Sequence, residues 1–67
     1  DYAKAATMFE LAKQKGGDDA DEVNTRLGIA KALGGDVASA KTAFQSVQAG
    51  TRKKIADLWL AYLATKA

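Results

Sequence analysis

The 67-residue sequence contains no cysteine, no histidine and no proline. Without cysteine there can be no disulfide bond. Without cysteine and histidine, the usual zinc ligands, the thiol nucleophile and the commonest general base are missing. The sequence also lacks a run of eighteen apolar residues and a charged-then-apolar leader, so we expect neither a membrane span nor a signal peptide. These absences argue against an enzyme, and they predict neither a cofactor nor a metal site.

Composition indicates one small folded domain. Hydrophobic residues make up 48% of the chain and charged residues 27%, and ten basic residues stand against eight acidic ones for a net charge of +2. A chain of this length buries only about 60% of the surface that its unfolded form exposes. Stability must therefore come from helix packing alone.

Glycines divide the chain into four helix-length segments, because helix formers dominate elsewhere and glycine commonly ends a helix. The breaks fall at Gly16-Gly17, Gly34-Gly35 and Gly50. Apolar residues recur at helical steps in the first three segments: Tyr2, Ala5, Phe9 and Ala12; Val23, Leu27, Ala30 and Leu33; Val37, Ala40, Phe44 and Val47. This spacing predicts an all-α fold of about four helices.

Acidic and hydroxyl residues mark the predicted helix starts. Four carboxylates precede or open the second helix: Asp18, Asp19, Asp21 and Glu22. Their spacing does not match a calcium-binding loop, so they predict helix capping instead. Asp36 and Thr51 are the predicted N-caps of the third and fourth helices.

The fourth helix is apolar on nearly all sides, since Asp57 is the one polar residue in 55–64. One interpretation is a core helix that closes the domain. A second is an exposed interface patch formed by Leu58, Trp59 or Tyr62. Contact with a membrane surface is a third.

The chain also contains an internal repeat. A shift of 35 residues aligns five identical pairs: Asp1 with Asp36, Ala3 with Ala38, Ala5 with Ala40, Thr7 with Thr42, and Phe9 with Phe44. A shift of 33 aligns the second helix with the fourth more weakly, placing Val23, Leu27 and Gly28 over Ala56, Leu60 and Ala61. A period of 33 to 35 residues with two helices per unit predicts a stack of helix pairs.

The complete unit resembles the tetratricopeptide-repeat family. The resemblance lies in Leu27-Gly28, the Gly35-Asp36 turn, and Ala40 and Phe44 in the following helix, although Asn24 stands where the family usually has a large aromatic residue. It implies a right-handed superhelix of antiparallel helix pairs.

The resemblance also implies a division of the single domain formed by residues 1–67. Residues 1–17 would be the second helix of a preceding repeat, 18–50 one complete repeat, and 51–67 a C-terminal or capping helix. A start on a second helix predicts that the natural protein extends further towards its N-terminus.

The repeat assigns packing roles to six residues: Ala5, Phe9, Leu27, Gly28, Ala40 and Phe44. Glycine inside a helix costs roughly 1 kcal/mol relative to alanine, so we expect Ala40 to approach the backbone of Gly28 closely. Phe44 would fill the wider gap between repeats, as Phe9 would in the preceding unit.

The family resemblance implies a non-catalytic scaffold that binds another protein or peptide in the groove lined by the first helices of successive pairs. The groove residues would be Glu22, Thr25, Arg26, Ile29, Leu33, Leu58, Trp59 and Tyr62. An uncovered helix face also allows self-association. In the alternative hypothesis, Arg26, Arg52, Lys53 and Lys54 bind nucleic acid or another polyanion, although a nucleic-acid site usually needs a wider basic face.

Overall fold

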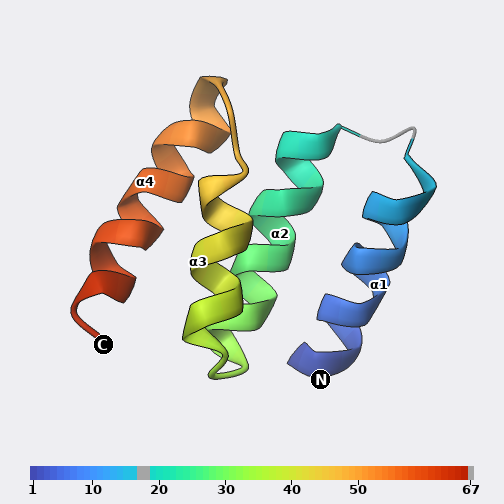
Figure 1. Cartoon of the computed structure of the whole chain (residues 1–67), viewed down its shortest axis with the longest axis horizontal. Helices are drawn as coiled ribbons and strands as arrows, with labels where there is room; N and C mark the ends of the chain where they lie inside the picture. Colours follow the sequence, from blue (N-terminus) through green and yellow to red (C-terminus); the bar gives the residue numbers. More distant parts are fainter. Residues whose placement is uncertain (17–18, 67) are drawn as a thin grey trace.

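The computed structural model describes residues 1–16 and 19–66. Within these ranges the chain forms four α-helices and no strand: α1 (Tyr2–Lys15), α2 (Ala20–Leu33), α3 (Val37–Gln45) and α4 (Gly50–Ala64). Successive helices run in opposite directions, in a flat body whose Cα extents are 33 × 28 × 14 Å (Figure 1). The predicted all-α fold of four helices is confirmed. In the part of the chain described, no helix has the length and apolar character needed to cross a bilayer.

Aspartate side chains cap the first three helices. Asp1 accepts hydrogen bonds from the amides of the first turn of α1, and Asp19 accepts them from Asp21 N–H and Glu22 N–H at 2.9 and 3.3 Å. Asp36 accepts from Ser39 N–H at 3.1 Å. The predicted cap of the third helix is thus confirmed, and Asp19 is the acidic residue that caps the second. Asp18 and Gly17 lie outside the described residues.

The turn between α2 and α3 is a Schellman motif. Asp36 N–H donates to Lys31 O at 2.9 Å, and Gly35 N–H donates to Ala32 O at 3.1 Å. Gly35 has a φ of 90°, which L-residues with a side chain rarely adopt. The Gly34-Gly35 break therefore ends its helix as the sequence predicts.

The junction between α3 and α4 differs from the prediction. The third helix ends at Gln45, before Val47, and α4 begins at Gly50 with Ala49 at its N-cap, so Thr51 is not the cap. No side chain caps the start of α4. Asp21 of α2 instead accepts hydrogen bonds from Gln48 N–H at 2.9 Å and Ala49 N–H at 3.3 Å. These tertiary hydrogen bonds hold the segment in an extended path that a continued α3 could not follow.

Helix α2 packs against each of the other three helices. One core cluster comprises Ala40, Phe44, Val47, Ala56 and Leu63, and a second comprises Ala6, Leu27, Ala30 and Ala43. Ala5 and Phe9 are partly buried and pack against the second cluster. The six predicted packing residues therefore all lie in or beside the core, with Gly28 buried in α2.

Gly28 makes the close contact that the repeat predicts, but with a different partner. A Cβ atom built on Gly28 would lie 2.6 Å from Cε1 of Phe44, and the next two nearest atoms also belong to that ring. The side chain nearest to this glycine is thus Phe44 and not Ala40. The Phe44 ring occupies the space next to Gly28. It lies between α2 and α4 and is only 1% exposed.

Candidate functional site

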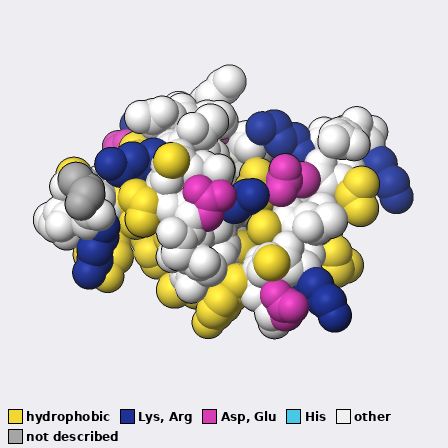
Figure 2. Space-filling view, turned by 60° about the horizontal axis from the view of Figure 1, so that its bottom comes forward, with side chains coloured by type: hydrophobic (Ala, Val, Ile, Leu, Met, Phe, Trp, Pro, Cys, Tyr) yellow, Lys and Arg dark blue, Asp and Glu magenta, His cyan; other side chains and the backbone are white. Residues whose placement is uncertain are grey.

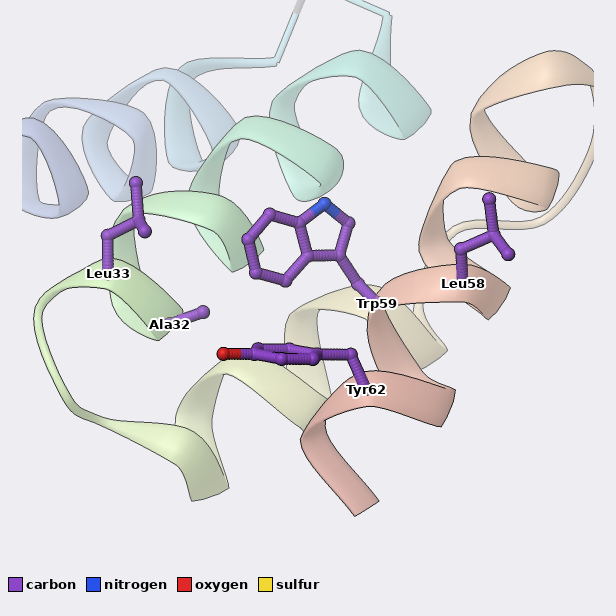
Figure 3. A pocket seen from close by; sticks show the side chains of 5 residues that line it. All are labelled: Ala32, Leu33, Leu58, Trp59 and Tyr62. Atoms are coloured by element: carbon purple, nitrogen blue, oxygen red, sulfur yellow. The ribbon is translucent and has the colours of Figure 1, made fainter. Parts of the chain in front are cut away.

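An apolar hollow of about 380 Å³ lies between α2 and α4. Its lining residues are Ala32, Leu33, Leu58, Trp59 and Tyr62. The rings of Trp59 and Tyr62 extend from α4 towards α2, and Leu33 and Leu58 stand on opposite sides of the indole (Figure 3). We call this hollow the α2–α4 groove.

Aromatic contacts fix the floor of the α2–α4 groove. The ring of Trp59 stacks on buried Phe44, with centroids 5.5 Å apart and planes inclined by 13°. Tyr62 meets Trp59 edge to face at 6.0 Å, and Lys66 Nζ lies 4.9 Å from the centroid of the Tyr62 ring. Because one face of Trp59 rests on the core, the groove has a preformed aromatic surface.

The side chains around this floor are open to solvent. Leu33 is 51% exposed, Leu58 72% and Tyr62 53%. Helix α4 combines two of the predicted alternatives, since Ala56 and Leu63 are buried in the core while Leu58 and Tyr62 form an exposed apolar patch. Large exposed apolar side chains grouped around a hollow are typical of binding surfaces.

The apolar surface continues from the α2–α4 groove towards α1. A second, open hollow of about 280 Å³ is lined by Tyr2, Phe9, Arg26, Ile29, Ala30 and Leu33, so Leu33 borders both. Figure 2 shows that hydrophobic side chains gather mainly along the lower side of the molecule in that view. The two hollows together give an apolar strip across α1, α2 and α4.

The structure brings half of the predicted groove residues together. Leu33, Leu58, Trp59 and Tyr62 line the α2–α4 groove, and Arg26 and Ile29 lie beside it in the second hollow. Glu22 and Thr25 line neither hollow.

Glu22 joins α2 to α4 through an ion pair, with Arg52 Nη2 at 3.1 Å from Glu22 Oε2. Thr25 is only 6% exposed, and its hydroxyl donates to Asp21 O at 2.7 Å. Buried in this way, Thr25 offers no side chain to a partner in the groove.

Carboxylates neutralise much of the predicted basic face. Arg26 lies 3.6 Å from Glu22, which also pairs with Arg52, and Lys53 Nζ lies 2.6 Å from Asp57 Oδ1. Three of the four proposed polyanion-binding cations are thus in ion pairs. Among residues 1–16 and 19–66, no group of three acidic residues is arranged to hold a metal ion.

Three notable residues were not anticipated from the sequence. Ala32 lines the groove, and Asp21 holds the α3–α4 connection rather than only favouring a helix start. Asn24 is 5% exposed, and its Oδ1 is the buried side-chain oxygen without a hydrogen-bond partner in the described part of the chain. The one signal in the sequence was that Asn24 stands where the tetratricopeptide-repeat pattern usually has a large aromatic residue.

Comparison of the chain with models of known protein families, with curated protein sequences and with solved structures finds no match.

Proposed function

We propose that this chain is a non-catalytic protein-interaction module built from tetratricopeptide-like antiparallel helix pairs, and that its α2–α4 groove binds an apolar segment of a partner polypeptide. The observation that carries the proposal is the preformed aromatic floor of Trp59 surrounded by exposed Leu33, Leu58 and Tyr62. In this architecture α2 and α3 are one complete pair, α1 is the second helix of a preceding pair, and α4 is the first helix of a following one.

The packing of Phe44 supports the helix-pair arrangement. Its ring contacts Gly28 of its own pair and stacks on Trp59 of the next helix. A residue that fills the gap between successive units in this way is what a stacked repeat requires, because one helix pair cannot bury its apolar face alone.

The energetics favour a partner of moderate affinity. Each half-exposed apolar side chain that a partner covers contributes on the order of 1 kcal/mol, because full burial of a large side chain is worth about 1.5–3 kcal/mol. Association also costs several kcal/mol of lost motion. The rigid Trp59 lowers that cost, since its position is already fixed by Phe44.

A binding screen with defined peptides tests this function. Random peptides of about 15 residues, long enough for a helix of about 22 Å, would be selected on the purified chain, and the chosen ones titrated while the fluorescence of Trp59 is followed. We expect apolar side chains at helical or alternating spacing, and an affinity that changes little with salt. Affinity for acidic peptides that falls steeply with salt would instead support the polyanion hypothesis.

A matched pair of variants locates the site. Leu33→Glu places a charge beside the floor of the groove and should weaken binding at least tenfold. Gln45→Glu adds the same charge at the same position of a helix, the last residue of α3, but outside the groove. Equal affinity of the two variants would contradict the assignment of the groove.

A further inference from the structure

We infer that a second copy of this chain is the partner of its two end faces, with α1 of one copy lying against α4 of the next. The inference rests on the proposed helix pairs and not on peptide binding in the α2–α4 groove. Helix α1 corresponds in sequence to α3, and α4 corresponds to α2. Since α2 and α3 form the central pair of the structure, α4 and the α1 of another copy can form a pair of the same kind.

Helix α1 exposes the face that α3 buries. In α3 and the residues directly after it that face is covered, and each of its residues has a more exposed counterpart in α1 at the shift of 35. The buried residues Ala40, Phe44 and Val47 correspond to the partly buried residues Ala5, Phe9 and Ala12, respectively. The largest difference is between Ala43, which is 4% exposed, and its counterpart Met8, which is 69% exposed. Phe44 has a helix on both sides, whereas among the described helices α1 contacts α2 alone.

Helix α4 shows the complementary difference. Asn24, Thr25 and Gly28 of α2 are all buried, and the ring of Phe44 covers Gly28. Their counterparts at the shift of 33 are Asp57, Leu58 and Ala61, all of which are exposed, Leu58 by 72%. Helix α4 therefore has no described helix packed on the face that corresponds to the α3-facing side of α2. Likewise, α1 has no described helix packed on the face that corresponds to the α2-facing side of α3.

The exposed face of α1 is apolar, and that of α4 presents Leu58 and Ala61 beside Asp57, whose charge is paired with Lys53. On α1, Met8, Leu11 and Ala12 border an open hollow of about 340 Å³ beside Lys15 and Gly16. Leu11 is itself 50% exposed. Burial of these side chains against α4 removes apolar surface from water on both copies, which is the driving force that holds α2 and α3 together.

The observed α2–α3 contact also fixes a register for the new pair. By the same correspondence Ala61 of one copy should lie opposite Phe9 of the other; because Ala61 carries the methyl group that Gly28 lacks, the partly buried Phe9 must turn aside from it. In α2, Asp21 accepts hydrogen bonds from the backbone amides of Gln48 and Ala49, which follow α3. The corresponding position of α4, 33 residues later, is occupied by Lys54.

That register brings like charges together at one end of the contact. Gln48 follows the end of α3, and Lys13, its counterpart, lies in the last turn of α1, so the antiparallel contact places Lys54 near the start of α4 of one copy close to Lys13 of the other. Salt screens this repulsion, and we therefore expect association to strengthen at higher ionic strength.

A contact between two different faces leaves one free face of each kind at the ends of every assembly. Such an interface grows into a ring or an open filament instead of stopping at a two-fold dimer. The average mass should therefore rise continuously above the 7.0 kDa of one chain as concentration increases.

Complementation between two variants tests this arrangement by sedimentation equilibrium. Met8→Glu damages the α1 face alone, and Ala61→Glu damages the α4 face alone; neither residue lines the α2–α4 groove. We expect each variant to be monomeric by itself and an equal mixture to form a dimer of twice the chain mass, since each supplies the face that the other lacks. Thr7→Glu is the control, because Thr7 and its counterpart Thr42 are both exposed. Circular dichroism confirms that the variants fold.

The other outcomes are equally definite. A wild-type chain that stays monomeric at millimolar concentration overturns the inference. Loss of association in one variant alone would mean a contact between two like faces, and association that weakens with salt would contradict the register. Peptide binding in the groove is measured separately with Leu33→Glu, so its failure and the failure of this contact can be told apart.

Discussion

Replacement of Gly28 by alanine tests the central packing contact of the structure. The added methyl group would lie 2.6, 2.7 and 2.8 Å from three atoms of the Phe44 ring. Carbon atoms pack best at about 3.5–4.0 Å, so the ring must retreat by about 1 Å. It has no free path, because Phe44 is 1% exposed and its other face stacks on Trp59.

The expected loss follows from two opposing effects. Overpacking of a tight core costs about 1–3 kcal/mol, and contact with three ring atoms at these distances favours the upper half of that range. Alanine gains about 1 kcal/mol over glycine in a helix interior. We therefore expect Gly28→Ala to lower the free energy of unfolding by about 1–2 kcal/mol, which for a chain of this size lowers Tm by about 4–15 °C.

The assay is thermal and urea unfolding followed by far-ultraviolet circular dichroism at low protein concentration. Phe44→Leu and the double variant complete a double-mutant cycle. Without the ring, Gly28→Ala should become neutral or stabilising. If Gly28→Ala is as stable as the wild-type chain while Phe44 is present, the close approach of ring and backbone does not exist.

Three further changes have definite expected outcomes. Asn24→Leu removes a buried oxygen without a partner, so urea unfolding should show a gain of about 1 kcal/mol, whereas Asn24→Ala leaves a cavity and should not. Asp21→Ala deletes two hydrogen bonds to the α3–α4 connection and should cost about 1–3 kcal/mol, and Asp21→Asn should cost less. The hydrogen bond from Ser39 N–H lowers the pKa of Asp36 below its ordinary value of 3.8, so its stabilising effect is present above pH 3.8 and is lost as the pH falls further. Thermal unfolding between neutral pH and a pH of about 2 should therefore show a steeper acid loss for wild-type protein than for Asp36→Asn; equal slopes would contradict this.

Local signals predicted the helices well. The double glycine at Gly34-Gly35 and the aspartate at Asp36 act through hydrogen bonds within a few residues of the chain. Such contacts can be recognised from sequence because both partners belong to the same short segment. The N-cap of α4 was predicted two residues late, at Thr51 instead of Ala49, because the bonds that shape that junction come from Asp21.

The candidate site was less predictable because exposure depends on the tertiary arrangement. Leu33, Leu58, Trp59 and Tyr62 were placed in the groove through the family resemblance, and they do surround one hollow. Thr25 was assigned to the same groove, but the fold buries it. Helical periodicity gives the face on which a residue lies, and it does not show which faces a neighbouring helix covers.

The central position of α2 has a consequence for how the molecule opens. Helix α2 contacts every other described helix, whereas α1 contacts α2 alone. Detachment of α1 therefore breaks one helix–helix interface, whereas exposure of α2 breaks every interface except that between α3 and α4. In native-state hydrogen exchange, the amides of α1 should exchange through a partial opening of low free energy, and those buried in α2 only through unfolding of the whole chain. We therefore expect α2, α3 and α4 to unfold as one cooperative unit and α1 to open separately.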